Sequence, residues 1–193
     1  MHALLQENTV ISEHEYLAHY SQLPDVKYEY INGEIWAMGN ASKSHNVIAG
    51  NFYVPFRLHL KGTSCMVYME TQKIKVGQNY YLPDVIVDCG KQDDKYTATQ
   101  PIVIIEVLSE STRETDLTIK LRDYQKIPSL QEYVLVEQDF MAVTVYRRVD
   151  DWKAQTYSQS DDLIELKSID FAIMVAEIYA DVVFPEKKHF QAA

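Results

Sequence analysis

The chain has few cysteines and no sequence of low complexity. Among its 193 residues are only two cysteines, Cys65 and Cys89, which form neither a C-x-x-C motif nor a zinc-ligand spacing. We therefore expect free thiols, as in the reducing cytoplasm. Hydrophobic residues make up an ordinary 47% of the chain, which excludes a fibrous or disordered protein.

Long apolar runs and a basic leader are also absent. No stretch approaches the roughly 18 apolar residues that span a bilayer, and the longest apolar runs, such as residues 102–105, have the length of a strand. The first ten residues, MHALLQENTV, lack the basic start and apolar stretch of a secretory signal. We therefore expect a cytoplasmic protein with no membrane partner.

Positive charge is scarce as well. The chain has 18 Lys and Arg against 28 Asp and Glu, a formal net charge of −10. This argues against a non-specific nucleic-acid coat, because such proteins bind by neutralising phosphates. It does not exclude a nuclease, since a metal site built from carboxylates is itself acidic and a divalent ion brings its own positive charge.

Three catalytic signatures are missing from the sequence. They are G-x-x-x-x-G-K-[ST], G-x-S-x-G and H-E-x-x-H. Their absence argues against nucleotide-driven motors, serine hydrolases and zinc proteases.

The hydrophobic pattern predicts a mixed α/β (α+β) sheet flanked by helices, in one domain over residues 1–193 with a core over about 12–180. Ser12 and Glu15 form a capping box, and Asn32-Gly33 predicts an N-terminal hairpin. A second helix starts at Ser42 or Ser44 and is kinked or broken at Pro55. Further segments are a turn at 77–79, a helix following 109–115, strands at 65–69, 72–76, 85–88, 101–108, 132–136, 143–147, 163–166 and 169–171, and a short helix at 175–179.

A single charge, Glu106, interrupts the apolar run at 101–108. A buried, unpaired carboxylate is costly, so Glu106 needs a cation, a proton or a cleft unless it faces water at the strand end. Asp84 heads the preceding predicted strand. If the strands are neighbours, the two carboxylates converge and repel unless they share a proton or a divalent metal. Oxygen ligands with open positions suit Mg²⁺ or Mn²⁺.

Lys120 is the third candidate. The spacing of Leu117 and Tyr124 places it on or beside the apolar face of the predicted helix, and Asp116 is four residues away, where it can pair with Lys120. Lys120 is either a solvated or snorkelling lysine or an ammonium that reaches back over the strand of Glu106. In the second case it would orient an attacking water or stabilise a phosphate transition state.

Four other residues carry weaker signals. His45 opens the second helix, where the helix N-terminus disfavours a protonated imidazole; it is either a neutral ring facing the cleft or an exposed histidine. Glu29 and Glu34 flank the hairpin turn, and both can be solvated. Tyr124 either hydrogen-bonds within the site or packs, and we favour packing.

Pro83-Asp84 followed by Glu106-Val107-Leu108 resembles the PD-(D/E)XK nuclease pattern, with Leu108 where the usual lysine would stand. The surrounding sequence is similar to the Uma-two family of restriction-endonuclease-like proteins over roughly residues 12–180. The similarity is carried by YEYINGEI (28–35), SHN (44–46), YYLPDV (80–85), IEVLSEST (105–112) and the spaced residues Asp116, Lys120 and Tyr124.

The resemblance implies a restriction-endonuclease-like fold with an αβββαβ core, flanking helices and an N-terminal hairpin. It implies Asp84, Glu106 and the Val107 carbonyl as metal ligands, with Lys120 replacing the lysine that is missing at position 108. With His45, the acids and Lys120 form the expected catalytic set. The expected cofactor is Mg²⁺ or Mn²⁺, the expected partner is nucleic acid, DNA before RNA, and a homodimer would serve to cut two strands.

Three classes of function stay open. Our main hypothesis is a metal-dependent endonuclease. The second is a catalytically degenerate nuclease-fold module that binds DNA or a protein partner, which the net charge and Leu108 favour. The third is a small-molecule phosphohydrolase, which needs a closed pocket in place of a groove.

Overall fold

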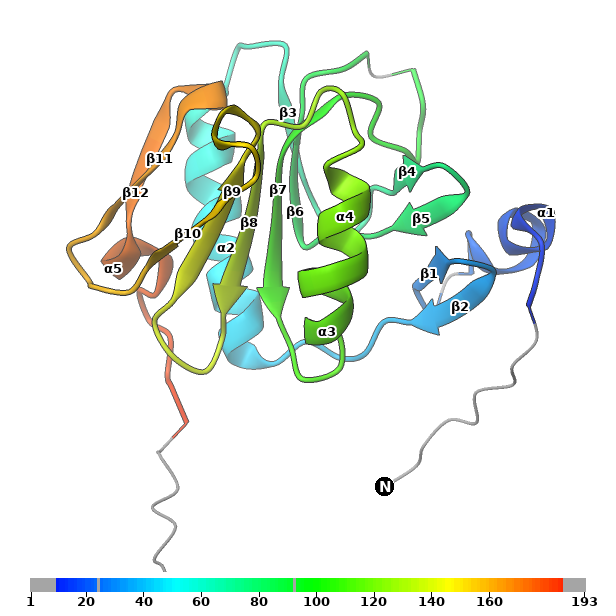
Figure 1. Cartoon of the computed structure of the whole chain (residues 1–193), viewed down its shortest axis with the longest axis horizontal. Coiled ribbons are helices and arrows are strands. Elements are labelled where there is room, and N and C mark those ends of the chain that lie inside the picture. Colours follow the sequence, from blue (N-terminus) through cyan, green and yellow to red (C-terminus); the bar gives the residue numbers. More distant parts are fainter. Residues whose placement is uncertain (1–9, 24, 92, 186–193) are drawn as a thin grey trace, which may run out of the picture.

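A six-stranded mixed sheet forms the centre of the molecule in the computed structural model, which describes residues 10–23, 25–91 and 93–185 (Figure 1). The strand order is β10-β9-β8-β7-β6-β3, with β7 parallel to β8 and the other neighbours antiparallel. The strands are β3 (Met66–Met69), β6 (Val85–Asp88), β7 (Pro101–Leu108), β8 (Glu132–Glu137), β9 (Val143–Arg147) and β10 (Ala154–Tyr157). The sequence analysis missed β10, whose residues are mostly exposed.

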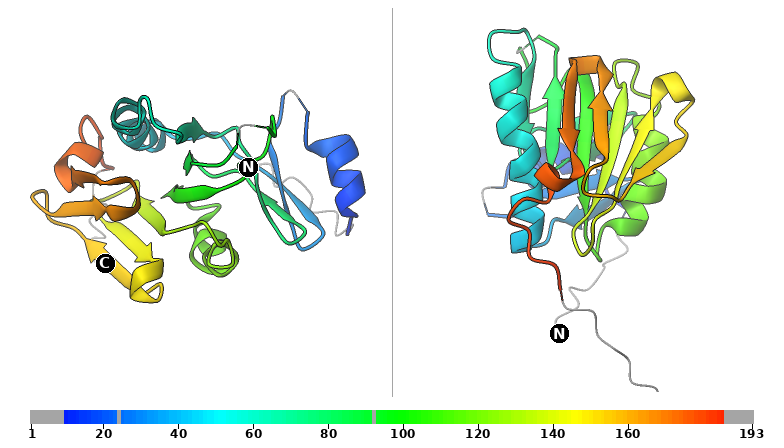
Figure 2. Two further views of the ribbon diagram at one scale, coloured as in Figure 1. Left: turned by 90° about the horizontal axis from the view of Figure 1, so that it is seen from above. Right: turned by 90° about the vertical axis from the view of Figure 1, so that its left-hand side faces the viewer.

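Helices cover both faces of this sheet (Figure 2). Helix α2 (Lys43–His59) packs on one face. A helical segment packs on the other face; it consists of α3 (Arg113–Thr115), a π-helical turn (Asp116–Lys120) and α4 (Leu121–Tyr124). Side chains of β7 alternate between the two cores, with Ile105 facing α2 and Ile104 facing Tyr124. The order α2, β3, β6, β7, α3–α4, β8 is the predicted αβββαβ core.

Helix α2 begins at Ser42, whose hydroxyl accepts a hydrogen bond from the backbone N–H of His45 at 3.0 Å. Its buried stripe of Ile48, Phe52 and Phe56 repeats at helical spacing and packs on the sheet. The helix is continuous through Pro55, so the alternative of a break there is wrong. Packing of this stripe on both sides of the proline compensates for the backbone hydrogen bond that proline cannot donate.

A second sheet with order β2-β1-β5-β4 lies beside the first (Figure 1). Its strands are β1 (Tyr28–Ile31), β2 (Glu34–Ala37), β4 (Ile74–Val76) and β5 (Asn79–Tyr81). The predicted hairpin turn is confirmed, with φ of 52° at Asn32 and 90° at Gly33. The turn predicted at 77–79 ends earlier than expected, and Asn79 starts a strand that the sequence analysis missed.

Short elements complete the two ends of the described chain. The capping box of Ser12 and Glu15 starts α1 (Glu13–Glu15), which continues as a π-helical turn (Tyr16–Tyr20). The ring of Tyr16 stacks on Tyr30 with centroids 5.1 Å apart, which joins this helix to the hairpin. At the other end, β11 (Leu163–Leu166) pairs with β12 (Phe171–Met174), followed by α5 (Val175–Ile178).

Cys65 and Cys89 form a disulfide, so the prediction of free thiols is wrong. The antiparallel register of β3 and β6 pairs Met66 with Asp88. The next residues in that register are the two cysteines, whose Cα atoms lie 4.0 Å apart. The strand pairing therefore brings the two thiols together, which the spacing of the cysteines in the sequence does not reveal. In the described part of the chain, no helix has the length and apolar character needed to cross a membrane.

Candidate metal and catalytic site

A cavity of about 990 Å³ opens where the carboxyl end of β7 meets the start of α2, the hairpin β1–β2 and the helical segment after β7. It collects side chains from segments far apart in the sequence. All five residues predicted for the site line it, and so do two acids to which the sequence analysis gave little or no weight. The lining includes Glu29, His45, Glu70, Asp84, Glu106, Val107 and Lys120.

Asp84 and Glu106 lie at the same end of neighbouring strands. The antiparallel pairing of β6 with β7 joins Val85 to Ile105, and the two acids are the next residues in that register. The Asp84 carboxylate accepts a hydrogen bond from the Val107 backbone N–H at 2.7 Å. The prediction that these strands are neighbours is therefore confirmed, and both carboxylates face one cavity.

Lys120 is buried, with only 2% of its surface exposed. Its Nζ lies 3.0 Å from Glu29 Oε1, 3.1 Å from Glu106 Oε1 and 3.0 Å from Asp116 Oδ1. The solvated lysine that the sequence left open is thus excluded, and the pairing with Asp116 is confirmed. The ammonium is the shared counter-ion of three carboxylates that come from β1, β7 and its own helical segment.

Glu106 has a second partner, the hydroxyl of Tyr124, which donates to its Oε1 at 3.0 Å. Tyr124 is fully buried, and it packs edge-on against the rings of Tyr81 and Tyr133. Packing alone, the reading favoured from the sequence, is therefore incomplete, because the same side chain also orients the Glu106 carboxyl group.

Burial and charge act in opposite directions on this cluster. The pKa of Glu106 lies well above its ordinary value, because burial raises it and nearby carboxylates, including that of Asp84, raise it further. The charge of Lys120 acts in the opposite direction and lowers it in part. Burial would lower the pKa of Lys120, but the carboxylates around it together raise that pKa well above its ordinary value. Three carboxylates surround the single ammonium of Lys120. This excess of negative groups favours the binding of an additional cation.

His45 lies in the first turn of α2, is largely buried and has its Nε2 3.2 Å from Asp84 Oδ2. Burial would lower the pKa of His45, but the hydrogen bond to Asp84 and the charges of Asp84 and Glu70 together raise it. The exposed histidine that the sequence left open is excluded, because the ring is buried and lines the cavity. The Nδ1 atom of His45 is buried and has no hydrogen-bond partner among the described residues.

Glu70 is a site residue that the sequence analysis missed. It follows β3, and its backbone N–H donates to the carbonyl of Asp84 at 3.1 Å, continuing the pairing of Met69 with Val85. Its φ of 54° is uncommon for a residue other than glycine, a backbone strain often found at functional sites. A signal for Glu70 was present in the sequence, because this acid directly follows the strand predicted at 65–69. If that strand pairs antiparallel with the strand at 85–88, its end lies beside Asp84.

The donor set fits a divalent metal ion. One ligand atom from each of His45, Glu70 and Asp84 lies within 4.8 Å of the others. Carboxylate oxygens suit Mg²⁺ and Mn²⁺, and the imidazole adds a nitrogen donor. The family resemblance implies a different ligand set, which consists of Asp84, Glu106 and the Val107 carbonyl. Asp84 is the one residue that belongs to both sets.

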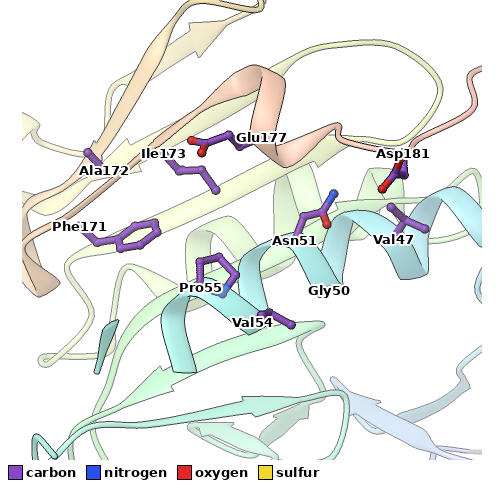
Figure 3. A pocket seen from close by; sticks show the side chains of 10 residues that line it. All are labelled: Val47, Gly50, Asn51, Val54, Pro55, Phe171, Ala172, Ile173, Glu177 and Asp181. Carbon is purple, nitrogen blue, oxygen red and sulfur yellow. The ribbon is translucent and has the colours of Figure 1, made fainter. Parts of the chain in front are cut away.

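A second cavity of about 690 Å³ lies between α2 and the β12–α5 region (Figure 3). Its walls are largely apolar, with Val47, Val54 and Phe171 among the side chains shown. The ten labelled residues that line it include no histidine, cysteine or lysine. Its two carboxylates, Glu177 and Asp181, therefore have no lysine or histidine beside them in the lining, unlike the acids of the first cavity.

Comparison with known proteins identifies the family. Residues 14–176 match the model of the Uma2 (Uma-two) family, described as "Putative restriction endonuclease". This chain belongs to the Uma2 family. The uncharacterized protein slr1290 of Synechocystis is 38% identical over 180 residues, covering 90% of this chain and 94% of its own. A second Synechocystis protein, sll1609, is 31% identical over 150 residues, covering 74% and 83%.

A solved structure shares the fold of this chain. The crystal structure of a DUF820 protein from Anabaena variabilis, titled a "putative nuclease", superposes with a TM-score of 0.75 at 19% identity, covering 90% of this chain and 99% of its own. The restriction-endonuclease-like mixed sheet predicted from the sequence is thus confirmed. All the site residues named above lie within the matched Uma2 range.

Proposed function

We propose that this Uma2 protein is a Mg²⁺- or Mn²⁺-dependent endonuclease of the PD-(D/E)XK type that hydrolyses phosphodiester bonds in nucleic acid, with DNA as the expected substrate. The observation that carries the proposal is the 3.1 Å contact between Lys120 Nζ and the Glu106 carboxylate, in a cavity that Asp84 also lines. The lysine missing at position 108 is supplied by the next helical segment.

Asp84, Glu106 and the Val107 carbonyl would hold the ion, with His45 and Glu70 as additional donors beside Asp84. A bound divalent ion acidifies a coordinated water and neutralises charge on the scissile phosphate. The chain's own groups set the conditions for this. The Val107 N–H and the His45 ring fix the Asp84 carboxylate, and the Tyr124 hydroxyl fixes that of Glu106.

Lys120 would stabilise the negative charge that develops on the phosphate and orient the attacking water. Glu29 and Asp116 hold its ammonium from the side of β1 and from one helical turn away. His45 is the group beside Asp84 that can carry a proton, and it must be neutral to bind a metal. We further propose that the chain acts as one domain, with a homodimer for cutting two strands.

The alternative is a nuclease-fold module that binds DNA or a protein without cleaving. Two observations favour it: the formal net charge of −10, and a buried Leu108 at the position of the usual lysine. The contact of Lys120 with Glu106 favours the enzyme, because a module has no need to bury a cation beside the predicted metal ligands at the desolvation cost this carries.

Purified protein is expected to cleave supercoiled plasmid or single-stranded DNA when Mg²⁺ or Mn²⁺ is added and to leave both intact in EDTA. Gel electrophoresis of time courses with each ion measures this, with RNA as a parallel substrate. Cleavage that persists in EDTA would contradict metal dependence. If neither ion produces cleavage of any of the substrates, the enzyme is excluded and the binding module takes its place.

A further inference from the structure

Trp36 on β2 is the one tryptophan, tyrosine or phenylalanine among the described residues that line the site cavity. It is 37% exposed. The other exposed aromatic side chains include Tyr96 and Phe140, which are not part of this lining. An indole that is neither packed away nor placed on an open surface is available to a ligand in the cavity.

The hairpin register places Trp36 next to the catalytic cluster. Trp36 pairs with Glu29 across β1 and β2, so the two side chains lie on the same face as direct cross-strand neighbours. The Glu29 carboxylate lies 3.0 Å from Lys120 Nζ. The indole is therefore one cross-strand pair away from the ammonium that the proposed reaction uses.

The charges of the cavity exclude the usual basis of nucleic-acid affinity. Its lysines are Lys27, which pairs with Glu70 at 3.2 Å, and Lys120, which three carboxylates surround. The acids that line the same cavity are Asp25, Glu29, Glu70, Asp84 and Glu106. Affinity for a nucleic acid at this site must therefore come from the metal ion and from contacts that do not neutralise phosphates.

Stacking of a base on an aromatic ring is such a contact, and it is independent of sequence because every base has a π-face. A base inside an intact duplex presents its edges, since its faces are covered by its neighbours. An indole beside the reactive groups can therefore stack only on a base that is unpaired or at an end. The segment after β7 adds hydroxyl groups to the lining that can contact phosphate or sugar: Ser109, Ser111, Thr112 and Thr115.

We propose that Trp36 is the stacking platform for an unpaired nucleobase next to the scissile phosphate, so that the substrate is single-stranded or locally unpaired DNA. This inference rests on the proposed function and narrows it to one class of substrate. It predicts that a strand with a base at this position binds more tightly than the same strand with one abasic nucleotide there.

The test uses the fluorescence of Trp36. Trp36 and Trp152 are the two tryptophans of the chain. The ring of Trp152 lies 4.9 Å from the guanidinium of Arg148 and packs against the core on the Tyr124 side of the central sheet. In the full-length Trp152→Phe protein, Trp36 is the only tryptophan emitter. The probes are a short single-stranded oligonucleotide, its duplex and an abasic version, titrated in Ca²⁺, with a gel to verify that the strands stay intact.

The single strand is expected to quench Trp36 and to bind more tightly than the duplex. In a label-based binding assay on the otherwise wild-type chain, Trp36→Ala should weaken binding of the single strand about tenfold, Trp36→Phe should restore most of it, and the control Phe140→Ala should not change it. The abasic strand should bind wild type more weakly but bind Trp36→Ala as the intact strand does. Unchanged fluorescence on binding, or equal affinity of Trp36→Ala and wild type, would overturn the inference.

Cleavage assays separate this inference from the proposed function. If wild type and Trp36→Ala cleave single strands and duplexes with the same preference, stacking fails while the nuclease stands. If the single strand binds and quenches Trp36 but no metal ion produces cleavage, the nuclease fails while the base-binding site stands.

Discussion

Replacing Lys120 by methionine is expected to lower the free energy of unfolding by about 3–5 kcal/mol, because it removes one partner of a buried ionic cluster and leaves the others uncompensated. Methionine fills most of the volume of the lysine stem, so a packing defect contributes little. Glu29, Glu106 and Asp116 would then share a buried space without a cation. Urea unfolding in EDTA, followed by circular dichroism, measures the loss.

The loss should depend on pH. Burial raises the pKa of Glu106, and the charge of Lys120 lowers it. Without Lys120, the pKa of Glu106 in the folded protein therefore lies still further above its value in the unfolded chain. A folded state that binds more protons than the unfolded state loses stability as pH rises. The difference between wild type and Lys120→Met should therefore be smaller at about pH 5, just above the ordinary carboxyl pKa, than at about pH 8.

Lys75→Met is the matched control. Lys75 lies on β4, and its exposed ammonium pairs with the partly exposed Glu13 at 2.6 Å, so its loss should cost less than about 1 kcal/mol. If both variants lose equally little, the three carboxylates do not depend on Lys120, and the charge cluster as described is wrong.

Asp84→Asn and Glu106→Gln are each expected to reduce metal-dependent cleavage by about a thousandfold or more while the protein stays folded. A thousandfold corresponds to about 4 kcal/mol of transition-state stabilisation, which is within what a metal ion supplies. The amides keep an oxygen acceptor for the Val107 N–H and for the Tyr124 hydroxyl. Rates on plasmid DNA and the unfolding midpoint of each variant separate lost chemistry from lost structure.

Glu110→Gln serves as the control for both substitutions. Glu110 is an exposed acid on the segment after β7, flanked by two residues of the cavity lining but not itself among them. This variant should cleave at the wild-type rate. Cleavage by Asp84→Asn or Glu106→Gln at the same rate as Glu110→Gln would show that these carboxylates do not take part in the reaction.

Local sequence pattern pointed to residues that the structure brings together in the candidate site. Glu106 stands out because it is a charge inside an apolar strand, and the structure buries it beside Lys120 and Tyr124. The spacing of apolar residues put Lys120 on or beside the apolar face of its helix and left a solvated lysine open, which the burial of Lys120 excludes. The mixed sheet flanked by helices followed from the same patterns, because alternation and helical spacing are properties of contiguous segments, whereas the αβββαβ core was implied by the family resemblance.

The missed features depend on contacts between distant segments. Glu29 was left as a residue that can be solvated, yet it is buried against Lys120 because the second sheet packs over the cavity. Glu70 reaches Asp84 through the pairing of β3 with β6, and the same pairing joins Cys65 to Cys89. Two strands of known sequence can pair in several registers, so none of these contacts follows from spacing along the chain.

Calorimetric titration of Mn²⁺ into metal-free wild type and into Asp84→Asn tests most directly whether this cavity holds a divalent ion. Asp84 belongs both to the cluster with His45 and Glu70 and to the ligand set implied by the family resemblance. The account predicts saturable binding at or below millimolar Mn²⁺ in wild type and its loss in Asp84→Asn. Equal binding by the two proteins, or none by wild type, would contradict it.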